Sequence, residues 1–158
     1  MGSIFYSFIL ALWAGGMFIF TFLVTPVIFQ SFGRDTAGEI VGKLFPYYFP
    51  YNLVLSVLAL IIFLLFIGRQ GKIENKITMF LIAAAVLINI FIVFKLYPDI
   101  QSVKQQITTF ETQTDESPAR NQFRKMHGLS ALLNILLLLD GTALLILNST
   151  PKKLNYYP

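Results

Sequence analysis

A chain of 158 residues suffices for one domain, but 56% of it is apolar, only 13% is charged and its mean hydropathy is +0.68, which excludes an ordinary soluble domain. The net charge of +4 is spread over several short hydrophilic gaps, which argues against nucleic-acid binding, and zero cysteines exclude disulfides, thiolate metal sites and a cysteine nucleophile. The composition predicts an integral membrane protein whose partner is the lipid bilayer.

The first apolar run, about residues 4–29, predicts a retained membrane span. Its 26 residues would extend about 39 Å as a helix, more than the ~30 Å hydrocarbon core, so we expect a tilt or a bend at Pro26. A cleavable signal peptide fits this run poorly, because a basic leading segment and a small-residue cleavage site are missing. Between residues 35 and 48, apolar residues recur at helical spacing and predict a short helix lying at the membrane surface.

Three more spans are expected at about residues 51–67, 77–96 and 127–147. Helical spacing of apolar residues continues beyond the third span, and Ser117 followed by Pro118 is a good helix start. We therefore expect helices 3 and 4 to extend beyond the membrane as a hairpin, closed by a polar turn at 112–116. The predicted fold is all-α: a membrane four-helix bundle forming a single domain over residues 1–158.

An even number of spans places both termini on one side of the membrane. That side holds five basic residues in a short turn and a tail, whereas seven are spread over the two longer loops opposite. Because short basic loops govern insertion, we expect both termini in the cytoplasm, with the chain in a bacterial inner membrane.

Two sets of residues within the predicted spans are candidates for helix packing or for a functional site. Ser7, Ala11 and Gly15 are small residues four apart, which favours a tight helix crossing or a gap for a flat ligand beside Trp13. The intramembrane polar residues are Asp140, Asn134 and Asn89. An acid within a span costs about 2.5 to 3.5 kcal/mol at the bilayer centre, so Asp140 is interpreted as a hydrogen-bonded structural acid or as a site that handles protons or cations. Asn89 is interpreted as an interhelical hydrogen bonder.

His127 is the only histidine and lies where the fourth helix enters the membrane. Asn134 and Gly141 follow it at seven-residue intervals on nearly the same face. One interpretation is an axial ligand of a b-type haem, with a methionine or a partner subunit supplying the other ligand. The other is an interfacial histidine hydrogen-bonded to a neighbouring helix or to head groups. A metal site made only of histidines is excluded, and phosphate loops, nucleophile elbows and paired carboxylates within a span are absent from the sequence.

Two motifs carry a resemblance to a known family. The first motif is K-L-F-P-x-Y-F, and its defining residues are Lys43, Leu44, Phe45, Pro46, Tyr48 and Phe49. The second motif is F-x-x-x-H-G-L-S-x-x-x-N, and its defining residues are Phe123, His127, Gly128, Ser130 and Asn134. With the tryptophan-containing first helix, they resemble the transmembrane protein 205 family and its bacterial relatives. The resemblance implies a four-helix membrane bundle and, for eukaryotic members, a link to tolerance of toxic metals or drugs. Relatives commonly carry a histidine near the start of the first helix, where this chain has Tyr6.

Three functional hypotheses follow. The leading one is a non-enzymatic protein that works by association, as an accessory subunit of a membrane complex or as a homo-oligomer. The second is a b-type haem or quinone module that uses His127, Tyr6 and Trp13. The third is a small transporter that uses Asp140 and Asn134.

Overall fold

The described residues are almost entirely helical, as the hydropathy pattern predicts. The computed structural model describes residues 2–68, 73–107 and 117–149. Its elements in chain order are α1 (Gly2–Ile19), the π-helical turn η1 (Phe20–Val24), α2 (Thr25–Ser31), α3 (Arg34–Ile62), the π-helical turn η2 (Phe63–Ile67), α4 (Ile73–Phe91), the π-helical turn η3 (Ile92–Leu96), α5 (Tyr97–Lys104) and α6 (Pro118–Ser149). The predicted all-α fold is confirmed over these residues.

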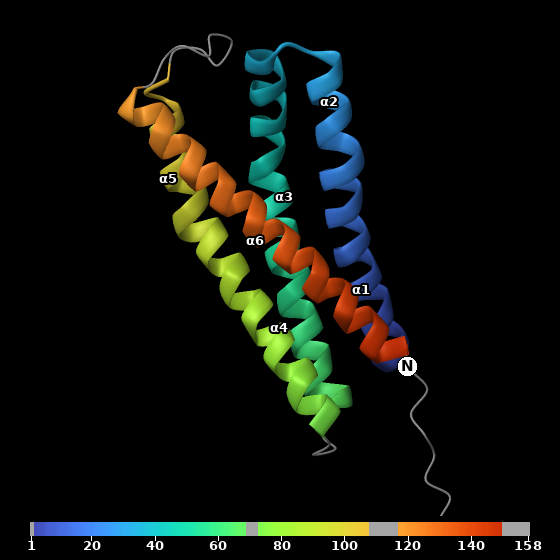
Figure 1. The fold of residues 1–158 in the computed structure, drawn as a ribbon. Helices are drawn as coiled ribbons and strands as arrows, with labels where there is room; N and C mark the ends of the chain where they lie inside the picture. The colour runs from blue at the N-terminus through green and yellow to red at the C-terminus, as the bar shows by residue number, and fades with distance from the viewer. Residues whose placement is uncertain (1, 69–72, 108–116, 150–158) are drawn as a thin grey trace, which may run out of the picture.

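Consecutive elements join end to end into four long rods (Figure 1). The rods are Gly2–Ser31, Arg34–Ile67, Asn75–Lys104 and Pro118–Ser149, and each is long and apolar enough to cross a membrane. Large apolar side chains such as Phe8, Leu87 and Leu139 are exposed on their outer faces. Apolar surface of this extent is expected on a protein solvated by lipid, so the chain is an integral membrane protein.

The rods pack into one bundle whose core lies between α1, α3, α4 and α6. Figure 1 shows the start of α1 and the end of α6 at one end of the bundle, and the α2–α3 connection, α5 and the start of α6 at the other. We call the second end the α5 end. The largest fully buried side chain is Trp13, the single tryptophan of the chain.

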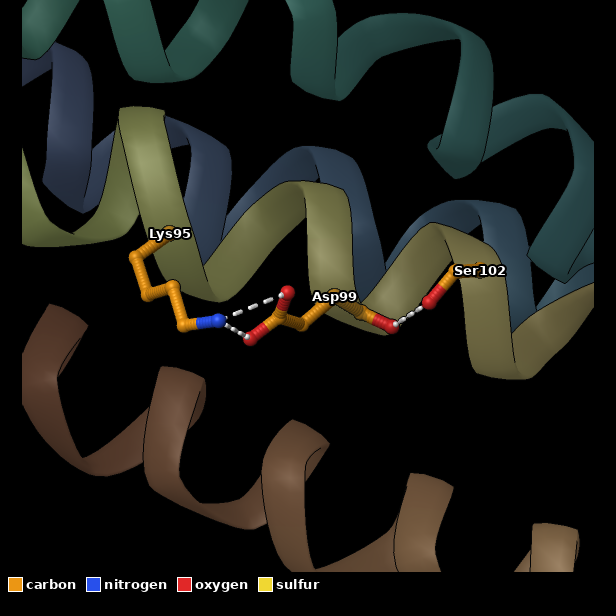
Figure 2. Close-up of polar contacts among 3 residues, drawn as sticks. All are labelled: Lys95, Asp99 and Ser102. Carbon is orange, nitrogen blue, oxygen red and sulfur yellow. Dashed lines mark hydrogen bonds and ion pairs between the residues drawn. The ribbon is translucent and has the colours of Figure 1, made fainter.

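Charged residues mark where the hydrocarbon region ends on the third rod. Every residue between Lys76 and Lys95 is uncharged, and the 19 positions that separate them correspond to about 28 Å of helix, close to the ~30 Å hydrocarbon core. The Lys95 Nζ atom lies 2.9 and 3.3 Å from the two carboxylate oxygens of Asp99, and the Ser102 hydroxyl donates to the Asp99 carbonyl at 2.8 Å (Figure 2). This exposed polar row belongs in the head-group layer.

α5 therefore rises above the hydrocarbon region, where it packs against α6. These two segments form the extension of helices 3 and 4 that the sequence predicts. The expected closing turn at 112–116 lies outside the described residues.

The helix expected at the membrane surface between residues 35 and 48 is not a separate element. It is the first half of α3, which continues through Pro46 and Pro50 into the second span. A proline inside a helix removes one backbone hydrogen bond, so it weakens a helix without forcing it to end. Buried residues continue on both sides of these prolines, from Val41 to Leu55, and this packing keeps the helix continuous.

The prolines of the first and third rods are accommodated by π-helical turns. η1 precedes Pro26 and η3 precedes Pro98. In each turn the last backbone N–H bonds to the carbonyl five residues earlier, Thr25 to Phe20 and Tyr97 to Ile92. Proline has no N–H to donate to the carbonyl four residues earlier. A turn with one extra residue lets other backbone N–H groups bond to the carbonyls near the proline, and this explains the local deviation from a regular α-helix.

Candidate functional site

A half-open cavity of about 590 Å³ lies at the α5 end, between α2, α3, α5 and α6. Its volume falls within the 300–1,000 Å³ range of small-molecule sites. Its apolar wall includes Phe29 from α2, Val41 and Phe45 from α3, Ile100 from α5 and Phe123 from α6. Segments far apart in sequence thus form a single pocket.

The charged part of the lining is entirely basic. The cavity is lined by Arg34, Lys104, Arg120 and Arg124, together with His127, and no acidic side chain lines it among the residues that the structure describes. Several like charges around an apolar hollow create a positive potential that attracts anions. The lining therefore suits a ligand that is negatively charged at one part and apolar at another.

Local packing holds two of these cations in place. Lys104 Nζ donates to the carbonyl of Gly38 at 3.0 Å, and a Cβ added at Gly42 would lie 3.2 Å from the same Nζ atom. Arg124 Nη2 donates to Asn121 Oδ1 at 2.9 Å. Lysine has three donor hydrogens and arginine five, so both side chains keep donors for a ligand.

The cavity lies on the α5 side of the Lys95–Asp99 pair, past the uncharged part of the third rod. Ile100 and Lys104 follow this pair toward the α5 end, and Arg120 and Arg124 precede the apolar part of α6. By helical rise, Lys104 stands roughly 13 Å beyond Lys95. The basic residues of the lining therefore lie outside the long uncharged runs of the third and fourth rods.

The two sequence motifs meet at this cavity. Phe45 of the first motif and Phe123 and His127 of the second line it. The rings of Phe123 and His127 stack with centroids 5.6 Å apart and an interplanar angle of 6°. Beneath them Tyr48 donates from its hydroxyl to Asn134 Oδ1 at 2.5 Å, which joins the two motifs directly.

The remaining motif residues surround this junction. Phe49 is buried and stacks on Phe45 at 4.9 Å. Lys43 is exposed and pairs with Glu39 at 2.7 Å. The other positions are Leu44 and Ser130, which are partly buried, and Pro46 and Gly128, which are exposed.

α1 and α6 run antiparallel with contacts that repeat every seven residues. Three pairs meet: Ser7 with Asn148, Ala14 with Gly141, and Thr21 with Asn134. The first and third pairs are hydrogen bonds from the asparagine amide to the hydroxyl, at 2.6 and 2.8 Å, and a Cβ added to the glycine of the second pair would lie 3.5 Å from the alanine methyl carbon. In lipid, such small and hydrogen-bonded contacts hold helices together.

Of the three small residues Ser7, Ala11 and Gly15 on α1, only Ser7 makes one of these contacts with another helix within the described residues. Ala11 is exposed, and a Cβ added at Gly15 would meet no atom within 4 Å. Instead, a Cβ at Gly16 would lie 2.7 Å from the hydroxyl of Tyr51, which donates to an α1 carbonyl at 2.7 Å. Gly16 therefore allows the close approach of α3 to α1.

The intramembrane polar residues lie in separate environments. Asn89 donates to Ser56 Oγ on α3 at 3.4 Å and to a carbonyl of its own helix at 3.0 Å. Asn134 is engaged by Tyr48 and Thr21, as described above. Asp140 is half-buried, and its Oδ2 atom has no hydrogen-bond partner among the described residues. The structure does not place Asp140 and Asn134 in one site.

Tyr6 and Trp13 belong to the core between α1 and α6. Both are fully buried, and neither the Tyr6 hydroxyl nor the Trp13 indole N–H finds a hydrogen-bond partner within the described ranges. Tyr6 lies within electrostatic range of Asp140, and a Cβ on Gly141 would approach the Trp13 ring at 3.7 Å.

The three residues considered for haem are thus not brought together. Gly141, which packs beside Trp13, is fourteen residues from His127 along α6, or about 21 Å. Axial ligation of one haem by both His127 and Tyr6 does not fit this arrangement, because Tyr6 lies in the core toward the other end of the bundle. A haem ligated by His127 with a methionine or a partner subunit stays a prediction. Among the residues that the structure describes, no three histidines or acids gather into a group that could hold a metal ion.

Sequence reasoning missed the basic lining of the cavity. Arg34, Lys104, Arg120 and Arg124 were weighed only as loop charges that decide orientation. Helical spacing carries the missing signal: 120, 123, 124 and 127 share one face of α6. The spacing on α6 alone does not reveal the partner helices, so the cavity itself requires the tertiary structure.

Comparison with known proteins gives a family without an assigned activity. Residues 8–109, which include most of α1 and everything from η1 to α5, match the family described as "Domain of unknown function (DUF4149)". An uncharacterized protein of Aquifex aeolicus (strain VF5) is 30% identical over 130 residues, which are 81% of this chain and 83% of that protein. No solved structure matches the chain at a significant level.

Proposed function

We propose, from the premise that the chain belongs to the family described as "Domain of unknown function (DUF4149)", that it is a non-enzymatic membrane protein that works by binding. The observation that carries this proposal is the cavity at the α5 end, with its basic lining and apolar wall. In this role the chain acts as an accessory or interaction subunit of a membrane complex, or as a homo-oligomer, and the cavity holds the anionic partner on which that role depends.

The arrangement of the bundle supports a binding role. Four helical segments, separated in sequence, converge on the cavity, so its lining is preorganised by the same packing that holds the bundle together. The cations and aromatic rings of the lining are groups that bind and orient a partner. Catalysis would instead need a general base, a general acid or a nucleophile placed against a second reactive group. His127 stacked on Phe123 is the one titratable imidazole in the lining.

The wider setting is part of the proposal. The resemblance to the transmembrane protein 205 family supports a bacterial member of that group, in the inner membrane. The basic turn and tail at the terminal end support termini in the cytoplasm, which would place the cavity on the opposite side.

Filling the cavity tests the proposal. Gly38 lines the cavity, and a Cβ there would meet no atom within 4 Å, so Gly38→Trp adds bulk without a backbone clash. Gly128→Trp is the matched control, because Gly128 also has open space around its Cβ position but does not line the cavity. We expect the native chain and the control to retain a molecule after purification in mild detergent, detected by mass spectrometry, and Gly38→Trp to lose it. Identical retention by all three would contradict the proposal.

A quinone module is a second candidate, because the Phe123–His127 stack offers a flat surface on the cavity wall. A quinone ring would stack on this pair. The absorption spectrum of an organic extract of the purified protein tests this candidate, with Phe123→Leu as the variant that loses the stack. An extract without a quinone band removes it, and a visible spectrum of the intact protein without a Soret band removes the haem hypothesis as well.

A further inference from the structure

We propose that the ligand of this cavity is an anionic phospholipid, with its phosphate held by the basic lining and the start of an acyl chain along the apolar wall. This inference rests on the proposed binding function and names the chemical class of its ligand. It depends on the composition of the lining, the position of the cavity and its opening toward lipid.

The basic lining matches a phosphate in charge and in geometry. Arg120 and Arg124 are one helical turn apart on α6, and Lys104 faces the same cavity from α5. A guanidinium group donates two parallel N–H bonds to phosphate oxygens, and an ammonium group adds a point charge. The described residues that line the cavity include no carboxylate, so a bound phosphate would face no opposing negative charge from them.

The apolar wall matches an acyl chain and not a free ion. Phe29, Phe45 and Ile100 line the cavity together with the cations. A hydrated inorganic phosphate would gain nothing from these three side chains, whereas a hydrocarbon chain would remove their apolar surface from water. The lining therefore favours an amphiphile over an ion.

The side of the cavity formed by α2 is exposed at the surface of the bundle. Phe29 lines the cavity and is nevertheless 45% exposed, and Val27 on the same short helix is 52% exposed. In this proposal the exposed apolar residues of α2 contact lipid, so a lipid enters the cavity sideways from the bilayer. Lys104 and Arg124 then bind its phosphate in the head-group layer of that leaflet.

The experiment measures lipid binding to the full-length protein by native mass spectrometry. The purified protein is stripped of lipid in a neutral detergent and titrated with phosphatidylglycerol, with phosphatidylcholine of the same acyl chains and with inorganic phosphate. We expect one phosphatidylglycerol per chain at an affinity at least tenfold above that of either other probe. Equal affinity for the two lipids would overturn anionic selectivity, and equal affinity for inorganic phosphate would overturn the role of the acyl chain.

Matched variants separate a built site from general surface charge. Lys104→Gln with Arg124→Gln removes two cations from the lining, whereas Lys95→Gln with Lys125→Gln removes two from the same rods outside it. We expect the first variant to lose at least tenfold in phosphatidylglycerol affinity and the second to lose less than threefold. Equal losses would overturn the proposal, because they would show a diffuse electrostatic attraction to the whole end of the bundle.

Two further readouts keep the outcomes distinct. Fluorescence of Trp13, which is buried away from the cavity, reports whether each variant is folded, and Arg124→Lys retains the charge if Arg124→Gln is unstable. If the purified chain carries a molecule that Gly38→Trp expels but that is not a phospholipid, the lipid inference fails and the binding function stands. If no probe binds and no molecule is expelled, both fail.

Discussion

Gly141 packs against the buried face of α1. A Cβ there would lie 3.5 Å from both Ala14 Cβ and Met17 Cε, which is ordinary van der Waals contact. An alanine therefore fits, but any larger side chain would have to displace Met17 or the ring of Trp13. The packing of this helix crossing thus requires a small residue at position 141.

Gly141→Leu should lower the free energy of unfolding by about 1 to 3 kcal/mol, because overpacking a filled core forces side chains and helices apart. Gly141→Ala should change it by less than about 1 kcal/mol. Thermal unfolding in detergent, followed by Trp13 fluorescence, measures both effects. Gly128→Leu is the control, since a Cβ at Gly128 meets nothing within 4 Å, and an equal loss there would contradict this account.

Asp140 has polar neighbours in the sequence, but their side chains do not hydrogen-bond to its carboxylate. Nearby polar side chains are engaged elsewhere: Thr142 donates to the Leu138 carbonyl at 2.8 Å, and Asn148 donates to Ser7. The Oδ2 atom of Asp140 is buried without a hydrogen-bond partner in the described part of the chain. A buried polar atom without a partner costs free energy, so we expect the charge of Asp140 to oppose the stability of the bundle.

Asp140→Asn should raise the free energy of unfolding by about 1 kcal/mol, because it removes a charge that a membrane interior disfavours. The measurement is the same thermal unfolding series, with Thr142→Val, two residues along α6, as a control that removes an uncharged polar group. A clear loss of stability in Asp140→Asn would show instead that the carboxylate has a bound partner in the membrane.

At the scale of elements, one side chain ties three rods together. Asn134 on α6 accepts from Tyr48 on α3 and donates to Thr21 in η1. Tyr48 also stacks on Phe20 at 4.0 Å, so the same junction carries polar and aromatic contacts. Tyr48 is three residues beyond Phe45 on α3 and Asn134 is seven beyond His127 on α6, so the junction follows the cavity lining along both helices.

A double-mutant cycle of Tyr48→Phe and Asn134→Leu should give a coupling energy of about 0.6 to 1.7 kcal/mol, the range measured for hydrogen bonds between membrane helices. The cycle is measured by unfolding in a series of denaturing detergent concentrations. Tyr47→Phe, at an exposed neighbouring position, should change stability by less than about 0.5 kcal/mol. Strictly additive single effects would mean that the Tyr48–Asn134 bond contributes nothing to helix association.

At the scale of the whole molecule, each of the four rods has at least 30 residues and is longer than the ~30 Å hydrocarbon core. On the third rod the uncharged run begins after Lys76 and ends before Lys95, and α5 extends past Lys95 to form one wall of the cavity together with α2, α3 and the start of α6. The two ends of the bundle therefore differ, and the cavity lies at the α5 end.

Cysteine labelling can test both depth and orientation, because the chain has no cysteine of its own. We expect a membrane-impermeant maleimide to label Gln105→Cys in intact inner-membrane preparations with the outer leaflet facing the reagent, and Lys76→Cys only after permeabilisation. Leu87→Cys, near the middle of the uncharged run between Lys76 and Lys95 and exposed on the outer face of α4, should stay unlabelled in both. Labelling of position 76 before permeabilisation would reverse the orientation, and labelling of position 87 would contradict the depth assigned to α4.

Much of the fold could be predicted because a segment that crosses lipid must be apolar and helical along its own length. Residues 77–94 are uncharged, and such a run forms a spanning helix whatever its neighbours are, since its backbone must satisfy its own hydrogen bonds. The helical spacing of residues 35–48 was recognised for the same local reason. Its continuation through Pro46 and Pro50 was not, because the packing that offsets two prolines comes from other rods.

The site could be predicted only in fragments. The heptad spacing of His127, Asn134 and Gly141 placed them on one face of α6, but it could not say that α1 would occupy the lower part of that face and leave the upper part open. Tyr6, Trp13 and His127 were grouped by residue chemistry, and the structure separates them along the bundle.

The sequence by itself therefore determined the solvent, the helical class, the number of rods and the residues that each rod turns to one side, because these follow from hydropathy and helical periodicity. The tertiary structure alone decided which faces meet, where Arg120, Arg124 and Lys104 converge, and that they converge around a cavity. The physical reason is that contacts between rods depend on crossing positions and side-chain fit over long sequence separations, which no local pattern encodes.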